Sequence, residues 1–416
     1  MLLHQTLKRW KKRSLHDEVQ VAMVNQPVHG QSNDENHREN SVHKVVNKPV
    51  HDDSNLYERA LDMNYAQQVH NVNKFGEHTS GTAVILIQVH DRAVFFTHLI
   101  DSLRVVRGIE KATIVISMDK FSTEINDIIA TIDFCRYITI FFPFAMQLFP
   151  SSFPGEDPND CSRDISRTEA IARKCNNAEY PDSYGHYREV RYVQIKHHWL
   201  WKLHMVFSGM KVLAEGKSPV LLLEEDYYVF PDILHCLELG IAFRESKCPR
   251  CDLISLGNYE PRQDYSTLAN HVDFNAWTST KSNMGMVITK QFYDKLAACT
   301  DMICDFDDYN WDWSLQAASL SCMSGGVFTV QFKASRVYHF GTCSGMHNSA
   351  NCNVDDHMRN VKSKLNSANL FPTSLHVTAD DPKPAINPRP NGGWGDLRDR
   401  TLCKKYKTLC ESALKS

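Results

Sequence analysis

An apolar run that leads directly into three acidic residues constrains this chain more than any other feature. Residues 220–228 read VLLLEEDYY and follow the turn-like sequence GKSP at 216–219. A short apolar run bounded by turn residues is typical of a buried strand in an α/β sheet. Open α/β sheets bind ligands beyond the carboxyl ends of their strands. The pattern therefore predicts a buried strand that delivers Glu224, Glu225 and Asp226 to a ligand crevice.

Three adjacent carboxylates repel one another, so a cation is expected to neutralise them, and a hard divalent metal ion suits carboxylate ligands. Because side chains alternate along a strand, we expect Glu224 and Asp226 to face one way and Glu225 the other. A solvated strand end is the alternative to a metal site, and the three acids alone do not decide between them.

Strand and helix patterns alternate along the chain after residue 82. This alternation predicts an α/β fold with a mostly parallel, doubly wound central sheet. A long helix over 193–213 is expected to bury an apolar stripe that includes Trp199 and Leu203. Further strands are expected at 83–89, 112–117, 137–142, 253–257 and 284–289, and further helices at 93–106, 123–134 and from about 231.

The amino-terminal part differs in composition from the rest. Residues 1–78 are rich in His, Asn, Asp, Val and Gln with little periodicity, which predicts a low-complexity, disordered stem before a folded domain at 79–416. Scattered histidines in the stem could instead bind metal. The basic run at 8–13 could touch anionic lipid or be a solvated tail. A net charge of −3 gives no case for nucleic-acid binding.

Thirteen cysteines indicate an oxidising compartment. Cys248 and Cys251 have a C-x-x-C spacing that also allows zinc, although a structural zinc site normally needs a second pair and the chain has no other C-x-x-C.

Eight sequence runs together make the chain recognisable. These runs, one of which is the acidic strand end, resemble the alpha-1,6-mannosyl-glycoprotein 2-beta-N-acetylglucosaminyltransferase family, also called N-acetylglucosaminyltransferase II. The resemblance covers residues 79–410. The resemblance implies a GT-A-type nucleotide-sugar transferase fold for the domain at 79–416. The runs are QVHDR (88–92), FCRYITIFFPF (134–144), EYPDSYGHYRE (179–189), KHHWLWKLH (196–204), LLLEEDYY (221–228), DDYNWDW (307–313), YHFGTCSGMH (338–347) and NGGWGD (391–396).

The resemblance implies an inverting enzyme that transfers GlcNAc from UDP-GlcNAc to the 2-hydroxyl of the α1,6-arm mannose of N-glycans. It would act in complex N-glycan biosynthesis with Mn²⁺ as cofactor. Three alternatives stay open: a β1,2-GlcNAc transferase with another arm preference, a non-catalytic glycan- or nucleotide-binding relative, and a phosphate-ester or pyrophosphate hydrolase that uses the acidic cluster.

By resemblance, Asp226 and His339 hold the Mn²⁺, and Asp312 is the base that removes the proton from the acceptor hydroxyl. Asp312 lies between two tryptophans, whose rings can exclude water and raise its pKa. Without the resemblance, His339 would be interpreted as a core histidine and Asp312 as an ordinary acid at a helix start. Asp307 and Asp308 are expected to be helix-terminal charges or caps.

The resemblance also implies the residues that bind donor and acceptor. For the acceptor these are Asn283, Tyr309 and Trp311, although core packing is the alternative for each aromatic residue. For the nucleotide, Arg262 lies one position from the place where the family has an arginine, which Gln263 fills here. The remaining nucleotide residues are Gln88, Val89, His90, Asp91, Arg92, Asp119, Gln194, Ile195, Lys196, His197, His198 and Glu225.

The resemblance implies five disulfides and leaves three cysteines, Cys135, Cys236 and Cys410, unpaired. The loop at 391–396 is expected to be a structural turn near one of these disulfides. The implied pairs are Cys161–Cys175, Cys248–Cys251, Cys299–Cys322, Cys304–Cys403 and Cys343–Cys352.

The family is anchored in the Golgi membrane by an amino-terminal helix, and such a helix needs ~20 apolar residues. Residues 1–78 contain no such run, so we expect either a truncated or misassigned start or another means of retention. The expected location is the Golgi lumen or membrane, and the expected partners are UDP-GlcNAc and the N-glycans of glycoproteins. Self-association as a homodimer is also compatible with the resemblance.

Overall fold

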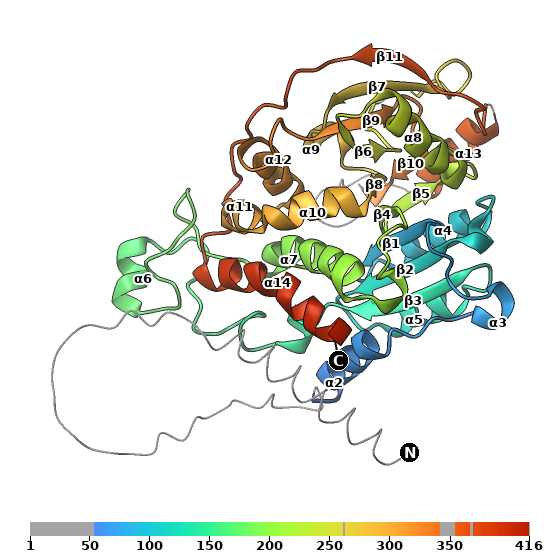
Figure 1. Ribbon diagram of the computed structural model, residues 1–416. Helices are drawn as coiled ribbons and strands as arrows, with labels where there is room; N and C mark the ends of the chain where they lie inside the picture. The colour runs from blue at the N-terminus through green and yellow to red at the C-terminus, as the bar shows by residue number, and fades with distance from the viewer. Residues whose placement is uncertain (1–53, 261–262, 342–353, 367–368, 416) are drawn as a thin grey trace.

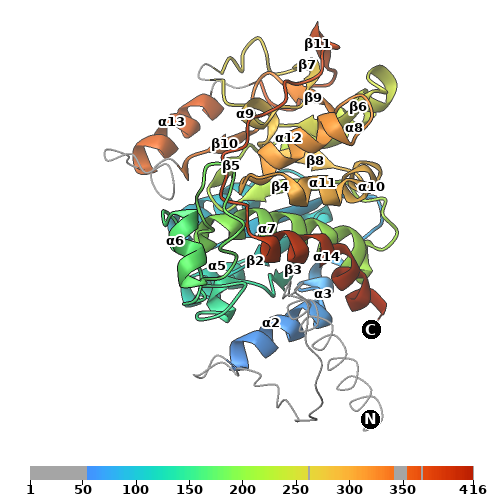
Figure 2. The same ribbon diagram turned by 90° about the vertical axis from the view of Figure 1, so that its left-hand side faces the viewer.

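The computed structural model describes residues 54–260, 263–341, 354–366 and 369–415 (Figures 1 and 2). Within these ranges the chain forms a nine-stranded mixed sheet in the order β11-β7-β9-β6-β8-β4-β1-β2-β3, and a two-stranded ribbon of β10 and β5. The strands are β1 (Val84–Val89), β2 (Thr113–Met118), β3 (Arg136–Phe141), β4 (Val220–Glu224), β5 (Tyr227–Val229), β6 (Cys251–Ser255), β7 (His271–Ala276), β8 (Met286–Ile288), β9 (Phe328–Phe332), β10 (Val337–His339) and β11 (His376–Asp380).

Helices cover this sheet and fill the connections between its strands. They are α2 (Ser54–Ala66), α3 (Val72–Phe75), α4 (Ala93–Arg104), α5 (Thr123–Ala130), α6 (Arg167–Arg173), α7 (Val190–His204), α8 (Ile233–Lys247), α9 (Ser279–Ser282), α10 (Lys290–Ala298), α11 (Thr300–Asp305), α12 (Trp311–Ser321), α13 (Val354–Asn366) and α14 (Leu397–Lys415).

The strands β3, β2, β1 and β4 pair in parallel, as the alternation of strands and helices predicts. The chain moves outward from β1 to β3 and then returns to β4 on the other side of β1. Crossovers between parallel strands are right-handed, which places α4 and α5 on one face of the sheet and α7 on the other. The reversal also makes the carboxyl ends of β1 and β4 a topological switch point, where α/β sheets bind ligands.

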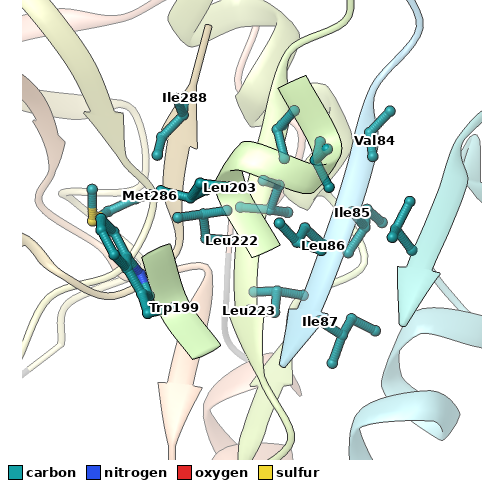
Figure 3. Packing of buried hydrophobic residues seen from close by; sticks show 14 of the residues in the cluster. Val84, Ile85, Leu86, Ile87, Trp199, Leu203, Leu222, Leu223, Met286 and Ile288 are labelled. Carbon is teal, nitrogen blue, oxygen red and sulfur yellow. The ribbon is translucent and has the colours of Figure 1, made fainter. Parts of the chain in front are cut away.

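One part of the core lies between α7 and the centre of the sheet. In Figure 3, Trp199 and Leu203 of α7 lie against Leu222 of β4 and Met286 of β8. All four side chains are buried, and they belong to one continuous hydrophobic cluster. Burying a side chain of this size contributes about 1.5–3 kcal/mol to folding. The predicted apolar stripe of the long helix therefore fixes α7 beneath the switch point.

The predicted helix over 193–213 differs from the structure at both ends. The α-helix runs from Val190 to His204 and continues as a π-helical turn at Met205–Gly209. The second face of α7 packs against α14, and the two helices lie side by side in both views (Figures 1 and 2). Because both faces are covered, most of its polar residues are buried as well, with Arg191 exposed at its first turn.

The folded domain begins before residue 79, so the predicted boundary at residue 78 differs from the structure. Helix α2 buries Ala60 and Leu61 against the domain. Asn64 Nδ2 donates to the backbone oxygen of Phe141 at 2.6 Å, and Gln67 Nε2 donates to that of Gly209 at 2.7 Å. These contacts hold the end of the predicted stem to the sheet, while residues 1–53 lie outside the described part of the chain.

Candidate active site

A cavity of about 630 Å³ opens at the carboxyl ends of β1, β2 and β4. Gln88 is the last residue of β1 that lines the cavity, Asp119 follows β2, and the acidic run begins at the last residue of β4. Three strands that are neighbours in the sheet thus present polar side chains to one space. The predicted site residues that line it are Gln88, His90, Asp91, Arg92, Asp119, Gln194, Ile195, Glu225, Asp226, Asn283, Trp311, Asp312 and His339.

All three acids of the central run line the cavity. The strand β4 ends at Glu224, and the next two residues form a turn before β5 begins. Side-chain alternation holds only while the backbone stays extended. Glu225 reaches the cavity from this turn, where Arg92 and the backbone N–H of His90 donate to its carboxylate, and the predicted alternation stays a prediction.

Asp226 and His339 meet across the small ribbon. Asp226 immediately precedes β5, and His339 pairs with Tyr227 in the antiparallel partner strand β10. His339 Nε2 lies 3.0 Å from Asp226 Oδ2, while Asp226 Oδ1 is buried without a hydrogen-bond partner. Gly341 lets the backbone lie close to this pair, because a Cβ there would lie 1.8 Å from Asp226 Oδ2 and 2.8 Å from His339 Nε2.

Arg92 joins two of the acids from the loop after β1. Its Nε donates to Glu225 Oε1 and its Nη1 donates to Asp226 Oδ2, each at 2.7 Å. The other oxygen of Glu225 accepts from the backbone N–H of His90 at 2.9 Å. Burial raises the pKa of Asp226, but the hydrogen bonds and charges of His339 and Arg92 outweigh burial and hold it below its ordinary value. Asp226 is therefore a carboxylate at neutral pH.

Asp119 is held between two histidines. Its Oδ1 lies 2.6 Å from His90 Nδ1, and its Oδ2 lies 3.3 Å from His198 Nδ1. Burial lowers the pKa of His90, but the hydrogen bond and charge of Asp119 raise it overall to about 9. The cavity wall at the end of β2 is thus an ion pair of His90 and Asp119 at neutral pH.

Asp312 lies in the first turn of α12 and lines the same cavity. The neighbouring Trp311 ring is stacked on Trp199 of α7, with centroids 4.3 Å apart. Asp312 Oδ2 accepts from Asn283 Nδ2 at 2.9 Å. Burial raises the pKa of Asp312 to about 6, against the opposing effect of the Asn283 hydrogen bond. This value suits a base that works near neutral pH.

Several predicted nucleotide residues do not line the cavity. The side chains of Val89, Lys196, His197 and His198 are fully buried away from it. Val89 faces the core, His197 Nε2 lies 3.0 Å from Asp399 Oδ1, and His198 supports Asp119 from behind. Arg262 lies outside the described residues.

Two other predicted positions lie at the edge of the site or serve a structural role. Gln263 is engaged by the fold, because its Oε1 accepts from Ser335 N at 2.8 Å and its Nε2 donates to Asn258 Oδ1 at 2.6 Å. Tyr309 lines a separate cavity of about 430 Å³. The two cavities share the wall formed by Arg191 and Tyr192, so Tyr309 lies next to the main cavity rather than in it.

Other cavity residues were given no role from the sequence. Glu224 was predicted to reach the ligand crevice only as part of the acidic run; its side chain is partly buried, and burial and Asp226 raise its pKa. Tyr259 follows β6, and a strand end is the signal that could have found it. The further residues of this kind are Met146, Arg191, Tyr192, Tyr227, Asn310 and Gly341.

The structure contains four of the implied disulfides: Cys161–Cys175, Cys248–Cys251, Cys299–Cys322 and Cys304–Cys403. The pair of Cys248 and Cys251 is thus a disulfide rather than a zinc site. Cys343 and Cys352 lie outside the described residues. Among the described cysteines, those at 135, 236 and 410 are unpaired and buried, as the resemblance implies. The disulfides are consistent with an enzyme of the secretory pathway.

In the described part of the chain, no helix has the length and apolarity to span a membrane.

The fold and the cavity define an α/β protein with a cavity at the carboxyl ends of parallel strands, lined by an acid–histidine pair and by a partly buried carboxylate. The family model described as N-acetylglucosaminyltransferase II (MGAT2) matches residues 57–403. The chain belongs to this family.

Relatives from animals and plants agree with this membership. The chain is 43% identical to the alpha-1,6-mannosyl-glycoprotein 2-beta-N-acetylglucosaminyltransferase of Rattus norvegicus, over 88% of this chain and 84% of that protein. The protein of the same name from Homo sapiens is 41% identical over 89% and 83%. The one from Arabidopsis thaliana is 27% identical over 82% and 78%. The crystal structure of S. aureus TarS 1–349 aligns with a TM-score of only 0.32 at 10% identity, over 63% of this chain and 61% of that chain, too low to bear on the fold.

Proposed function

We propose that this chain transfers GlcNAc from UDP-GlcNAc to the 2-hydroxyl of the α1,6-arm mannose of N-glycans, with inversion to a β1,2 linkage, in complex N-glycan biosynthesis. One observation carries the proposal: in a chain of this family, the partly buried carboxylate of Asp312 and the Asp226–His339 pair line the same cavity. The first can accept a proton from an acceptor hydroxyl, and the second can serve the diphosphate of the donor.

The residues around Asp226 fit a Mn²⁺ ion. The unpartnered Asp226 Oδ1 and the imidazole of His339 offer oxygen and nitrogen donors, and Gly341 places no side chain against them. Asp226 and His339 would hold the ion. A bound Mn²⁺ would supply Lewis-acid stabilisation of the charge that develops on the departing diphosphate. Two protein ligands leave the remaining coordination positions to diphosphate oxygens and water.

The nucleotide is proposed to lie along the ends of β1 and β2. Arg92 can offer charge-assisted hydrogen bonds to phosphate oxygens, because its guanidinium lines the cavity. Glu225 holds the backbone N–H of His90 and the side chain of Arg92, so it orients this loop as well as offering a carboxylate to the ribose. Asp119 and Gln194 line the same end of the cavity.

The acceptor is proposed to approach Asp312 from the side of Trp311 and Asn283. In the reaction, Asp312 takes the proton of the mannose 2-hydroxyl while that oxygen attacks the anomeric carbon and the bond to UDP breaks. A single displacement of this kind inverts the anomeric centre. A positioned base contributes about 10²–10⁴-fold to such a step. The indole of Trp311, fixed by its stack on Trp199, excludes water from the carboxylate.

The Golgi is the proposed location, with the enzyme associated with the Golgi membrane, because this is where the family acts. The four disulfides support a chain that folds in an oxidising compartment. Self-association as a homodimer is proposed on the resemblance alone.

The test is a transfer assay with the full chain and UDP-GlcNAc. Two N-glycan acceptors are compared, one with a free α1,6-arm mannose and one with a free α1,3-arm mannose, each with added Mn²⁺ and after chelation. We expect β1,2-linked product only on the α1,6 arm and only with the metal. Product on the α1,3 arm alone would identify a transferase of different arm preference. UDP release without a glycan product would identify a hydrolase.

A further inference from the structure

Lys196 is a buried basic residue that the reaction outlined above does not use. It lies on α7 with its side chain fully buried, and it does not line the cavity. Its Nζ donates to the backbone oxygens of Phe306 and Asp308, each at 3.0 Å. The same Nζ lies 4.2 Å from the ring centroid of Trp394. Every one of these partners belongs to a part of the chain far from α7 in sequence.

The two carbonyls belong to residues 306–310, which we name the α11–α12 loop. This loop leads directly into α12, whose first turn carries Asp312. The loop is held from a second side by Asn391, whose backbone N and Nδ2 donate to Asp308 Oδ2 at 2.7 and 2.9 Å. The other oxygen of Asp308 accepts from the backbone N of Asn310 at 2.8 Å. Asp308 therefore fixes the last loop residue before α12.

A third contact ties the beginning of the loop. Asp307 Oδ1 accepts from the backbone N–H of Trp394 at 3.1 Å, and Asp307 Oδ2 accepts from that of Ser183 at 2.6 Å. Gly392 forms an isolated bridge with Asp308. The loop at 391–394 thus encloses the α11–α12 loop from outside, and Lys196 holds it from inside.

A lysine in the interior is costly, because burial lowers its pKa well below the ordinary value and the ammonium loses its hydration. Two carbonyl acceptors and an aromatic face offset this cost only while the α11–α12 loop stays in place. An apolar side chain would fill the same volume at lower cost, so the ammonium is better explained by what it holds than by stability.

We propose that Lys196 is a positioning residue for the transfer reaction: it fixes the α11–α12 loop from inside and thereby sets the position of the Asp312 carboxylate. The inference rests on the proposed function, in which Asp312 is the base. Misplacing a catalytic group by 1 Å can cost about 10²-fold in rate. Lys196 acts on the acceptor side of the site, not on the nucleotide as its sequence position suggests.

The test compares Lys196→Met and the milder Lys196→Gln with a matched control, Arg136→Met. Arg136 is also buried and donates to backbone oxygens of distant segments, Phe75 at 2.5 Å and Lys111, but it lies at the amino ends of β2 and β3, away from the cavity. All variants are assayed in the full chain below the melting temperature of each. Measured are kcat, the KM for UDP-GlcNAc, and UDP affinity by calorimetry with Mn²⁺.

We expect Lys196→Met to lower kcat 10- to 100-fold with KM and UDP affinity within twofold, and Lys196→Gln to lower kcat less. We expect Arg136→Met to lower the melting temperature and leave kcat unchanged. An unchanged kcat in whichever Lys196 variant folds would overturn the inference, and so would a loss confined to KM or UDP affinity. The variant Asp312→Asn separates the two proposals. If it turns over at the native rate, Asp312 is not the base and the proposed function fails. If it is inactive while a Lys196 variant is fully active, only the positioning role of Lys196 fails.

Discussion

The side-chain amide of Asn283 donates to Asp312 Oδ2 at 2.9 Å, while its own Oδ1 is buried without a partner. Asn283 follows the short helix α9 and Asp312 opens α12, so the bond joins two elements at the cavity wall. A hydrogen bond to a carboxylate favours its charged form. Asn283 therefore moderates the pKa increase that burial imposes on Asp312.

Asn283→Ala should shift the acid limb of the rate profile to higher pH. Because the base must be ionised, kcat of the native chain should rise with pH through about 6, the pKa of Asp312. Removing the Asn283 hydrogen bond raises that pKa, so the variant should lose more activity at pH 6 than at pH 8. The measurement is kcat against pH, with Asn275→Ala on β7 as a control outside the cavity. An acid limb that does not move would contradict this account.

Asp312→Asn should lower kcat by about 10²–10⁴-fold, the usual contribution of a general base. The amide keeps the shape of the side chain, so UDP affinity in the presence of Mn²⁺ should stay within twofold by calorimetry. Asp301→Asn, an exposed acid on α11, should leave both quantities unchanged. Turnover of Asp312→Asn at the native rate would remove Asp312 as the base.

Gly341→Ala should weaken Mn²⁺ binding. The added Cβ would lie 1.8 Å from Asp226 Oδ2, so the carboxylate must turn away from its present position. The measurement is Mn²⁺ titration followed by electron paramagnetic resonance in the presence of UDP, with an expected loss of at least tenfold in affinity. Gly81→Ala is the control: its φ of +91° strains the backbone of the variant, but its Cβ meets no atom within 4 Å, so only general destabilisation is expected. Equal Mn²⁺ affinity in the two variants would argue against Asp226 as a ligand.

Removing individual disulfides should destabilise the chain in an order set by loop length. The Cys304–Cys403 pair spans 99 residues and the Cys161–Cys175 pair spans 14. In the chain-entropy description, closing loops of these sizes is worth about 4.7 and about 3 kcal/mol. Double Cys→Ser variants of each pair, compared by denaturant unfolding, should therefore lose more stability at 304 and 403. The reverse order would show that the entropy of the unfolded chain does not decide the effect here.

Much of the sheet is predictable because its central strands are buried on both faces. Such strands appear as continuous apolar runs, and β1, β2, β3 and β4 lie within one or two residues of their predicted positions. Strands at the other edge carry no such signal. β7 reads HVDFNA, and β11 reads HVTAD with every side chain exposed. Long-range pairing, rather than local pattern, makes these segments strands.

Site residues that directly follow a strand were predictable from the sequence. Site residues on a helix were not, because their orientation depends on which neighbours cover the helix. Asp119 and Asp226 were found at strand ends because the carboxyl ends of parallel strands meet at one edge. The residues that follow Gln194 on α7 show the limit of this prediction. Sequence alone cannot tell that α14 and the α11–α12 loop cover this helix. His197 therefore contacts Asp399 of α14, and Lys196 contacts Phe306 of the loop, instead of the nucleotide.

The packing of α14 imposes an order on biosynthesis. Asp399 and Tyr406 hold the two ring nitrogens of His197, at 3.0 and 2.6 Å, and Trp394 covers the ammonium of Lys196. Ribosomes synthesise chains from the amino end, so all the residues that line the cavity emerge before these three. A nascent chain stopped short of residue 394 would carry every residue that lines the cavity and still lack these three partners of Lys196 and His197. Activity in the cell should therefore appear only after translation has passed through α14.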